Sequence, residues 1–456
     1  MHIGKTGDAI TDPAQLAGWM QSGCKPRDNW RIGTEHEKFG FRLDGHGPVP
    51  YEGPDGIGAL LDALHTKLGW KPYLDEGNVI ALVDPKTGAS ISLEPGGQFE
   101  LSGAPLETIH ETCTESNAHL SVLRKCATPL GIGFLGLGAS PKWSLAETPR
   151  MPKSRYDIMT RYMPTVGSMG LDMMYRTATI QVNIDFESEA DMREKFQIAL
   201  KLQPLASALF ANSPFTEGKP NGHLTWRSHI WSDVDNRRAG LLPFVFSSEF
   251  GFEAYAEWAQ DVPMYFIIRD GHYIEMTDVT FRQYLQDGKT VDGVTHRATF
   301  GDWDDHLTTL FPDARIKRYM EMRGADGGPW RRICALPAFW IGLLYDADAQ
   351  ARTAELVKDW TLEEVQALRA ATPDQALRTQ FRDTNLRGVG RQVLDICRDG
   401  LKSRNRLNSS GLDETVFLPP LEETVVSGIT SAEAMLKKYH SVWQGDLDRV
   451  FIEYAY

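Results

Sequence analysis

The sequence predicts an α+β fold in which a mainly antiparallel sheet comes before most of the helices. Residues 31–101 contain segments where apolar and polar residues alternate with period two between glycines and prolines, which is typical of strands and turns. A helical period of 3.6 residues is found mainly later in the chain. Strands followed largely by helices favour α+β over a doubly wound parallel sheet.

The individual elements follow from the same periodicities. Strands are expected in four segments, residues 31–43, 88–103, 173–186 and 314–323. Helices are expected over residues 106–128, 189–210 and most of 351–440. In MYFIIRDGHYIEM, Asp270 and Gly271 separate two apolar runs, which is the strongest short signal for a hairpin.

We expect a single domain over residues 1–456. The chain contains no Pro/Ser/Gly-rich linker, low-complexity tract or repeat that would mark a boundary. Residues 1–30 would form an N-terminal extension, and residues 351–456 a mostly helical C-terminal part of the same domain. The composition, 42% apolar and 24% charged, is typical of a globular protein with a large core.

Targeting signals and cysteine usage predict a cytoplasmic protein. The N-terminus lacks the apolar region of a secretion signal, and no run of about 18 apolar residues would span a membrane. The five cysteines are scattered and show no CxxC spacing, so we expect a reducing compartment, no zinc site, and at most a regulatory disulfide.

The formal net charge of −13 makes nucleic acid an unexpected partner, because the field of the whole protein repels polyanions. The same field repels anionic metabolites such as ATP and glutamate. Anionic substrates would therefore need local cations, and a site for them should combine arginines with carboxylates that hold Mg²⁺.

Three short motifs resemble ligand sites but lack the required context. Residues 131–136 satisfy GxGxxG, yet a helix-like segment comes before them, so a glycine-bearing strand is the better interpretation. Residues 288–290 end like a P-loop, but Gln283 stands where its first glycine belongs. Residues 36–37 lack the second histidine of an HExxH zinc motif.

The strand at residues 31–43 carries the first candidate for chemistry. Glu35, Glu37, Phe39 and Phe41 share one face, which places two carboxylates about 7 Å apart and pointing the same way. Glutamates on a strand usually form a solvated face, but the phenylalanines on the same side argue against that interpretation. A bound cation would relieve the repulsion between the carboxylates.

Three further strands repeat this pattern of oxygen donors opposite apolar residues. The donors are Glu94 and Glu100 in the second segment, Gln181 and Asn183 in the third, and Glu321 beside Arg323 in the fourth. Mg²⁺ prefers six hard oxygen ligands and keeps several waters, so strands that offer oxygens to one concave face suit magnesium and phosphate chemistry.

The chain resembles the plant-type glutamate–cysteine ligases of plants and some proteobacteria from about residue 31 to its C-terminus. The resemblance rests on IGTEHEKFGF, SRYDIMTRYMP, SPFTEGKPNG, RSHIW, DVPMYF, RYMEMRGADGGPWRR and ALPAFW. It implies a glutamine-synthetase-like catalytic domain, in which a curved antiparallel sheet surrounded by helices forms an active-site funnel. It also implies an ATP-dependent ligase that joins the γ-carboxylate of glutamate to the amine of cysteine, the first step of glutathione biosynthesis.

The resemblance also implies roles for individual residues. The ligands of two or three Mg²⁺ ions bound with ATP would be Glu35, Glu37, Glu94, Glu100 and Glu321. Gln181 and Asn183 would lie close to the metal and the nucleotide, where Arg323 would contact the γ-phosphate and act in catalysis. Arg155 and Arg227 would grip the α-carboxylate of glutamate, since arginine binds carboxylates in a bidentate way. Tyr265 would lie at the cysteine pocket, although a half-buried hairpin aromatic is an equally good interpretation.

Cys113 and Cys334 match a cysteine pair that is linked with redox control in plant members, while Met276 occupies one position of a second pair. The alternative, two buried cysteines that act as small apolar residues, is favoured. The reactive acyl phosphate also needs protection from water, which closure of residues 324–328 or 213–222 would provide.

Other functions stay open at this stage. Clustered carboxylates also serve metal-dependent phosphohydrolases and phosphotransferases, and a nucleotide- or metal-binding regulator would need the same ligands. Within the ligases, a different amine acceptor is the main alternative. ATP, glutamate and cysteine are the expected partners, and a homodimer is possible.

Overall fold

The computed structural model describes residues 7–456 and is built around a nine-stranded sheet. The strand order is β16-β17-β7-β1-β5-β4-β3-β2, with β6 paired to β1 off this path. The strands are β1 (Ile32–Arg42), β2 (Lys71–Asp75), β3 (Asn78–Val83), β4 (Ser90–Leu93), β5 (Gln98–Ser102), β6 (Ile132–Leu135), β7 (Thr179–Ile184), β16 (Ala314–Ile316) and β17 (Met320–Asp326). All pairings in this sheet are antiparallel, which confirms the predicted α+β class.

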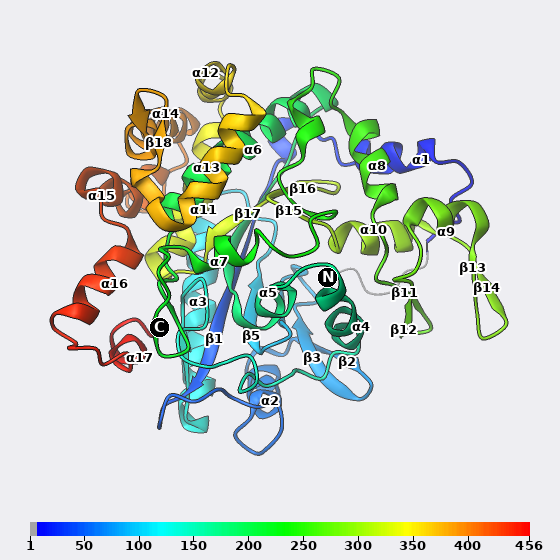
Figure 1. Ribbon diagram of the computed structural model, residues 1–456, viewed down its shortest axis with the longest axis horizontal. Coiled ribbons are helices and arrows are strands. Elements are labelled where there is room, and N and C mark those ends of the chain that lie inside the picture. Colours follow the sequence, from blue (N-terminus) through cyan, green and yellow to red (C-terminus); the bar gives the residue numbers. More distant parts are fainter. Residues whose placement is uncertain (1–6) are drawn as a thin grey trace.

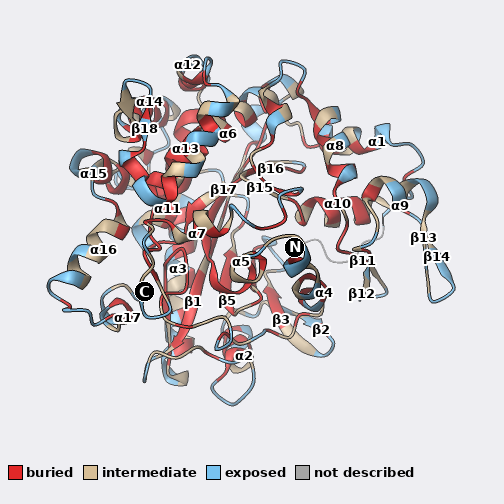
Figure 2. Cartoon of the chain, viewed as in Figure 1, coloured by how far each residue is buried: buried red, intermediate tan, exposed pale blue. Residues whose placement is uncertain are grey.

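Helices cover one face of the sheet, as Figure 1 shows. This helical layer packs on the sheet and is held together by contacts between its helices. It contains α3 (Ile109–Ala127), α6 (Glu189–Leu209), α11 (Trp330–Leu344), α13 (Leu362–Gln375) and α14 (Leu386–Arg404). The even positions of β7, Ile180, Val182 and Ile184, are fully buried in this core. Figure 2 shows the central strands as buried while outlying hairpins are exposed.

The remaining helices are α1 (Ala14–Gln21), α2 (Ile57–Leu68), α4 (Arg155–Tyr162), α5 (Gly170–Arg176), α7 (Trp226–Ile230), α8 (Phe252–Asp261), α9 (Phe281–Asp287), α10 (Phe300–Thr308), α12 (Ala347–Val357), α15 (Pro419–Ser427), α16 (Ser431–His440) and α17 (Arg449–Glu453). Of these, α2, α12 and α15 pack against helices of the layer that covers the sheet, and the others lie around the edges and the opposite face of the sheet. Residues 1–6 of the expected N-terminal extension lie outside the described residues. In the described part of the chain, no helix is both long and apolar enough to cross a membrane.

Short strand pairs complete the fold. They are β8 (Phe215–Thr216) with β9 (Lys219–Pro220), β10 (Ala239–Gly240) with β15 (Phe311–Pro312), β11 (Phe266–Arg269) with β12 (His272–Glu275), β13 (Lys289–Val291) with β14 (Val294–His296), and β18 (Gln380–Phe381) with β19 (Thr384–Asn385). The predicted hairpin is confirmed, because β11 and β12 pair across Asp270 and Gly271. Both turn residues have positive φ, 50° and 83°, as this turn type requires.

Two predicted boundaries are wrong. The strand expected over 173–186 starts only at Thr179, because residues 170–176 form α5 and bury Met173 and Met174. The segment 324–328, expected as a glycine-bearing loop, begins inside β17, which runs to Asp326 through a β-bulge between Met322 and Ala325. Tertiary packing overrides the local pattern at both places.

Candidate active site

The sheet face opposite the helices gathers the predicted polar residues through strand register. Glu37 of β1 lies directly opposite Glu100 of β5, and Glu35 lies opposite Gln181 of β7. On the far side of β7, Glu321 of β17 pairs with Asn183. Alternation along each strand and antiparallel register therefore bring residues from four strands onto one surface.

A cavity of about 220 Å³ lies over this surface. Among its lining residues are Glu35, Glu37, Glu94, Glu100, Gln181, Arg155, Arg227 and Arg323. These come from the sheet, α4, α7 and the turn after β4. The predicted residues Glu321, Asn183 and Tyr265 do not line the cavity wall, although Asn183 reaches it by donating a hydrogen bond to Glu35 Oε1 at 2.9 Å.

The acidic end of the cavity holds carboxylates whose hydrogen-bond donors are neutral. Glu37 accepts from the Thr179 backbone N–H at 2.9 Å, and Glu100 accepts from the hydroxyls of Ser92 at 2.9 Å and Ser102 at 3.1 Å. Burial, followed by the charges of Glu94 and Glu100, raises the pKa of Glu37 well above its ordinary value. These like charges face one another across neighbouring strands, and a cation would stabilise them.

The arrangement of these carboxylates can be compared with the way proteins bind Mg²⁺. Within residues 7–456, no three His, Cys, Asp or Glu side chains are gathered closely enough to hold a metal ion on their own. Mg²⁺, however, is usually bound by one or two carboxylates together with waters and substrate phosphates. The paired carboxylates Glu37 and Glu100, with Glu35 and Glu94 beside them, fit that mode of binding.

The opposite end of the cavity is cationic. Arg315 binds Glu321 through Nε and Nη2, while Arg323 lies 3.5 Å and Lys317 3.9 Å from the same carboxylate. Glu321 is buried, yet Arg315, Lys317 and Arg323 lower its pKa to about 2 despite that burial. Three cations around one carboxylate leave a positive surplus, which suits an anionic phosphate.

Arg323 is placed by β17 and by its neighbour on β7. Its Nη1 donates to Gln181 Oε1 at 2.5 Å, which turns the guanidinium toward the cavity. Burial and the nearby Arg315 lower its pKa to about 10, so it stays charged at neutral pH. An arginine that already has a charged neighbour and few anionic partners gains much from a phosphate.

Arg155 is the first residue of α4, which is anchored to the sheet at its start. The backbone N–H of Ser154 donates to Asp75 Oδ2 at 2.7 Å, which ties this helix end to β2. Arg155 Nη2 donates to the Tyr156 hydroxyl at 3.1 Å, while its buried Nε has no partner among the described residues. The guanidinium therefore keeps a free donor for a carboxylate.

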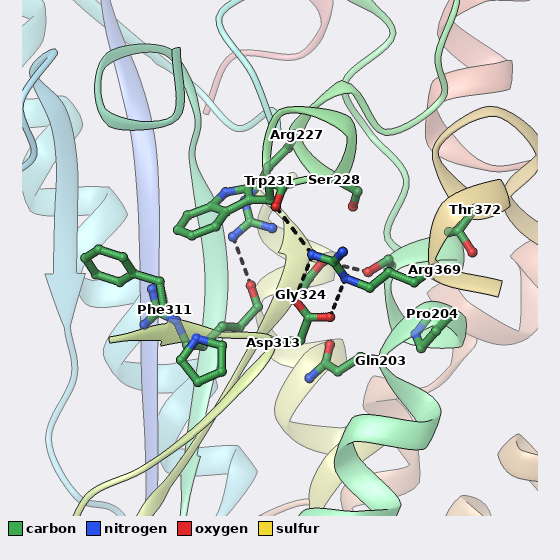
Figure 3. Close-up of a pocket in the computed structure, with 13 residues that line it drawn as sticks. Gln203, Pro204, Arg227, Ser228, Trp231, Phe311, Asp313, Gly324, Arg369 and Thr372 are labelled. Atoms are coloured by element: carbon green, nitrogen blue, oxygen red, sulfur yellow. Dashed lines mark hydrogen bonds and ion pairs between the residues drawn. The ribbon is translucent and has the colours of Figure 1, made fainter. Parts of the chain in front are cut away.

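Arg227 lies on the short helix α7 and separates two cavities. Its Nη2 donates to the Arg323 carbonyl at 2.9 Å, and its buried Nε has no partner in the described part of the chain. Behind it lies a smaller cavity of about 40 Å³, where Arg369 pairs with Asp313 (Figure 3). The guanidinium of Arg227 thus forms part of the wall between the two cavities.

The structure places Tyr265 away from the cavity wall. It is 1% exposed, Arg238 lies over its ring at 3.9 Å, and its hydroxyl contacts Met163 Sδ at 3.3 Å. The next residue, Phe266, lines the cavity instead. Tyr265 directly precedes β11, and in extended backbone neighbouring residues point to opposite sides, which accounts for the difference. A direct contact of Tyr265 with a substrate stays a prediction that this placement does not support.

Sequence reasoning missed Arg315, Trp231 and Phe311, all of which line the cavity. The sequence did contain a signal for Arg315, because a tight turn after residue 316 would place it opposite Glu321. The register of β16 and β17 pairs these two residues in this way. Phe311 gave no such signal, because its ring contact with Trp231 joins segments 80 residues apart.

Comparison with known proteins identifies the family of the chain. The model of glutamate–cysteine ligase family 2 matches residues 31–453. The chain is 52% identical over 450 residues to chloroplastic glutamate–cysteine ligase A of Oryza sativa subsp. indica, covering 98% of this chain and 89% of the rice protein. It is 53% identical over 441 residues to the chloroplastic enzyme of Arabidopsis thaliana, covering 97% of this chain and 82% of the relative.

A solved structure supports the fold. Glutamate–cysteine ligase of Francisella tularensis, in complex with AMP, superposes with a TM-score of 0.55 at 14% identity, covering 93% of this chain and 89% of that one. At this identity the likeness concerns the fold alone. The family model and the close relatives together show that the chain belongs to glutamate–cysteine ligase family 2, an ATP-dependent ligase family, as its motifs predicted.

Proposed function

We propose that the protein uses ATP to join the γ-carboxylate of glutamate to the amine of cysteine in the cavity above the sheet. The observation that carries this proposal is one cavity with an acidic end, at Glu37 and Glu100, and a cationic end, at Arg315 and Arg323. A ligase of this type must hold magnesium nucleotide beside an amino acid, and the two ends offer those two environments.

The acidic end is the proposed magnesium site. Glu35, Glu37, Glu94 and Glu100 would hold two or three Mg²⁺ ions, and Glu321 would join them after Arg315 turns to the phosphates. Bound Mg²⁺ would neutralise the charge that develops on the transferred phosphoryl group. The elevated pKa of Glu37 supports the proposal, because a bound cation would favour its charged form.

The chemistry at the cationic end follows from the weakness of a carboxylate as an electrophile. Transfer of the γ-phosphoryl group of ATP to the γ-carboxylate makes an acyl phosphate, which the cysteine amine then attacks with loss of phosphate. Arg323 would stabilise the charge spread over the equatorial oxygens of the transferred group. Gln181 holds Arg323 in place, and Asn183 fixes Glu35 beside it.

Arg155 and Arg227 form the proposed clamp for the α-carboxylate of glutamate. Both line the same cavity and both have a buried Nε without a partner among the described residues. The acceptor would lie against the aromatic wall that includes Tyr156 and Phe266, with Tyr265 behind that wall.

A coupled ADP-release assay tests this function. The protein would be given ATP, Mg²⁺ and glutamate, with cysteine or one of a panel of other amino acids as acceptor. We expect release to depend on both glutamate and cysteine. Equal rates with other acceptors would mean a different ligase, and ADP release without any amino acid would mean a phosphohydrolase.

A further inference from the structure

Asp326, at the end of β17, is a buried carboxylate that has no part in the proposed reaction. It is 1% exposed and accepts three hydrogen bonds from a distant segment. Oδ2 accepts from the Asn212 backbone N–H at 2.8 Å and from the Ser213 hydroxyl at 2.7 Å. Oδ1 accepts from the Thr225 hydroxyl at 2.8 Å.

Burying this carboxylate is costly, because all three donors are uncharged. Burial raises the pKa of Asp326, and the charge of Arg227 opposes that shift. The chain also leaves room for the carboxylate through Gly138, where a Cβ atom would lie 2.3 Å from Asp326 Cγ. Because burial of the Asp326 carboxylate is costly and requires a glycine beside it, we expect this carboxylate to have a role beyond packing.

Two of the three hydrogen bonds lead directly to the helix that carries Arg227. The Thr225 hydroxyl, bound to Asp326, also caps α7 by accepting from the Ser228 backbone N–H at 3.2 Å. The Ser213 hydroxyl, also bound to Asp326, accepts from the backbone N–H of Arg227 itself at 3.2 Å. In each case a single side chain, Thr225 or Ser213, therefore connects the Asp326 carboxylate to α7 by hydrogen bonds.

The helix needs such an anchor because it is short. α7 spans five residues, Trp226–Ile230, and a helix of this length has almost no stability of its own. The other end of Arg227 is also bound to β17, since its guanidinium donates to the Arg323 carbonyl. One strand thus holds both the backbone and the side-chain end of this arginine.

We propose that Asp326 is a positioning residue that sets Arg227 in place for the α-carboxylate of glutamate, acting through Thr225 and Ser213. This inference rests on the proposed role of Arg227 in binding glutamate. It gives β17 two roles, because the strand that carries Arg323 for the phosphate also fixes the clamp for the amino acid.

The test compares KM values for glutamate and ATP in purified variants. Asp326→Ala removes all three hydrogen bonds, and we expect the KM for glutamate to rise about tenfold or more because displacement of a positioning group has effects of this size. Asp326→Asn keeps the shape with one acceptor fewer, so a rise of about threefold is expected on the same grounds. The KM for ATP should stay within about twofold.

Thr225 supplies a pair of variants for the connection itself. Thr225→Val has nearly the same shape but no hydroxyl, so it should raise the KM for glutamate as Asp326→Asn does. Thr225→Ser keeps the hydroxyl and should restore a value near that of the wild type. Equal values in the Val and Ser variants would overturn the relay.

Glu414 is the matched control for a purely structural effect. It is 0% exposed, accepts from the Ile109 backbone N–H at 2.7 Å and from Arg404 at 3.0 Å, and belongs to the α3 and α14 region. Glu414→Gln should lower the melting temperature without raising the KM for glutamate. An Asp326 variant that behaves like this control, with lower stability and unchanged KM, would overturn the proposal.

Arg227→Ala separates this inference from the proposed function. If this variant raises the KM for glutamate and the Asp326 and Thr225 variants do not, only the positioning role fails. If Arg227→Ala leaves the KM for glutamate unchanged, the clamp itself is wrong and the positioning role falls with it.

Discussion

Two glutamates of the site, Glu35 and Glu321, show how strongly neighbours determine the behaviour of a side chain. Burial, followed by the charges of Glu100 and Glu321, raises the pKa of Glu35 to about 7. Glu321 is also buried, yet three cations lower its pKa to about 2. The two carboxylates belong to strands on either side of β7, so within one site the pKa of one carboxylate is raised and that of the other is lowered.

The raised pKa of Glu35 predicts a stability effect that depends on pH. Between the unfolded pKa of about 4.3 and the folded pKa of about 7, the folded protein holds a proton that the unfolded chain has lost. The free energy of unfolding therefore falls as pH rises through this window. Glu35→Gln avoids that loss, so without metal its melting temperature should exceed that of the wild type by about 2 °C at pH 8.

At pH 4.5 the same comparison should show little or no gain for Glu35→Gln, because Glu35 is then largely protonated in the folded protein. Thermal unfolding followed by circular dichroism at both pH values would measure this. A difference of equal size at the two pH values would mean that Glu35 does not titrate in this window.

Arg323 should matter for turnover more than for binding. In Arg323→Ala we expect turnover, measured by phosphate release, to fall about 100-fold, the usual effect of removing one transition-state donor. The KM for glutamate should change little, because Arg227 is held by the backbone carbonyl of residue 323, which alanine retains. Wild-type turnover in this variant would rule out the proposed role.

At the scale of elements, helices α11 and α14 cross at a contact that only glycine permits. A Cβ atom on Gly400 would lie 1.9 Å from the Gly342 carbonyl oxygen and 2.9 Å from the Ala349 Cβ. The helices can therefore pack backbone against backbone, and α11 in turn packs on β7 and β1. This contact joins two helices of the layer that covers the sheet.

Gly400→Ala should destabilise the protein by about 3 kcal/mol, because overpacking outweighs the gain in helix propensity. Gly18→Ala in α1 is the control, since a Cβ atom there meets nothing within 4 Å. That variant should be as stable as the wild type or about 1 kcal/mol more stable. Chemical denaturation would measure both, and equal stability of the two variants would contradict the contact.

Cys113 in α3 and Cys334 in α11 lie on two helices that pack together, and the neighbouring Cys113 thiol, followed by burial, raises the pKa of Cys334. We expect mild oxidation to produce a peptide that links the two residues, detectable by mass spectrometry, and Cys113→Ser to abolish it. Regulation by this pair stays a prediction. Failure to find the linked peptide would leave both residues as small buried side chains.

At the scale of the whole molecule, the positive charge at one end of the cavity contrasts with the negative net charge of the chain. The chain carries a net charge of −13, yet arginines and Lys317 concentrate at one end of the cavity. Local cations thus offset an unfavourable overall field, as anionic substrates require.

The largest hydrophobic cluster extends from Ile10 to Ala432 and includes residues of the sheet, α6, α11 and α14. Because these segments share one core, we expect a single cooperative transition in calorimetry. Two separated transitions would contradict the single domain expected over residues 1–456, with its C-terminal part from residue 351.

The strand segments and the faces of their residues could be predicted locally, as β1 illustrates. Alternation alone places Glu35 and Glu37 on one side, and the same rule applies to Gln181 and Asn183. Local patterns failed at α5, where burial of Met173 and Met174 extends a helix into an expected strand. Local patterns also do not say which residue near a hairpin meets the cavity, where Phe266 lines the wall and Tyr265 is buried behind it.

The sequence by itself therefore determined the fold class, the family and the side-chain types that serve the reaction, because period and motif are properties of neighbouring residues. Only the tertiary structure decided that Glu37 faces Glu100, that Arg315 pairs with Glu321, and that Asp326 reaches α7. These contacts depend on strand register and on packing between segments far apart in the chain. The free energy that stabilises these contacts comes from burial of the whole core, so no local sequence pattern predicts them.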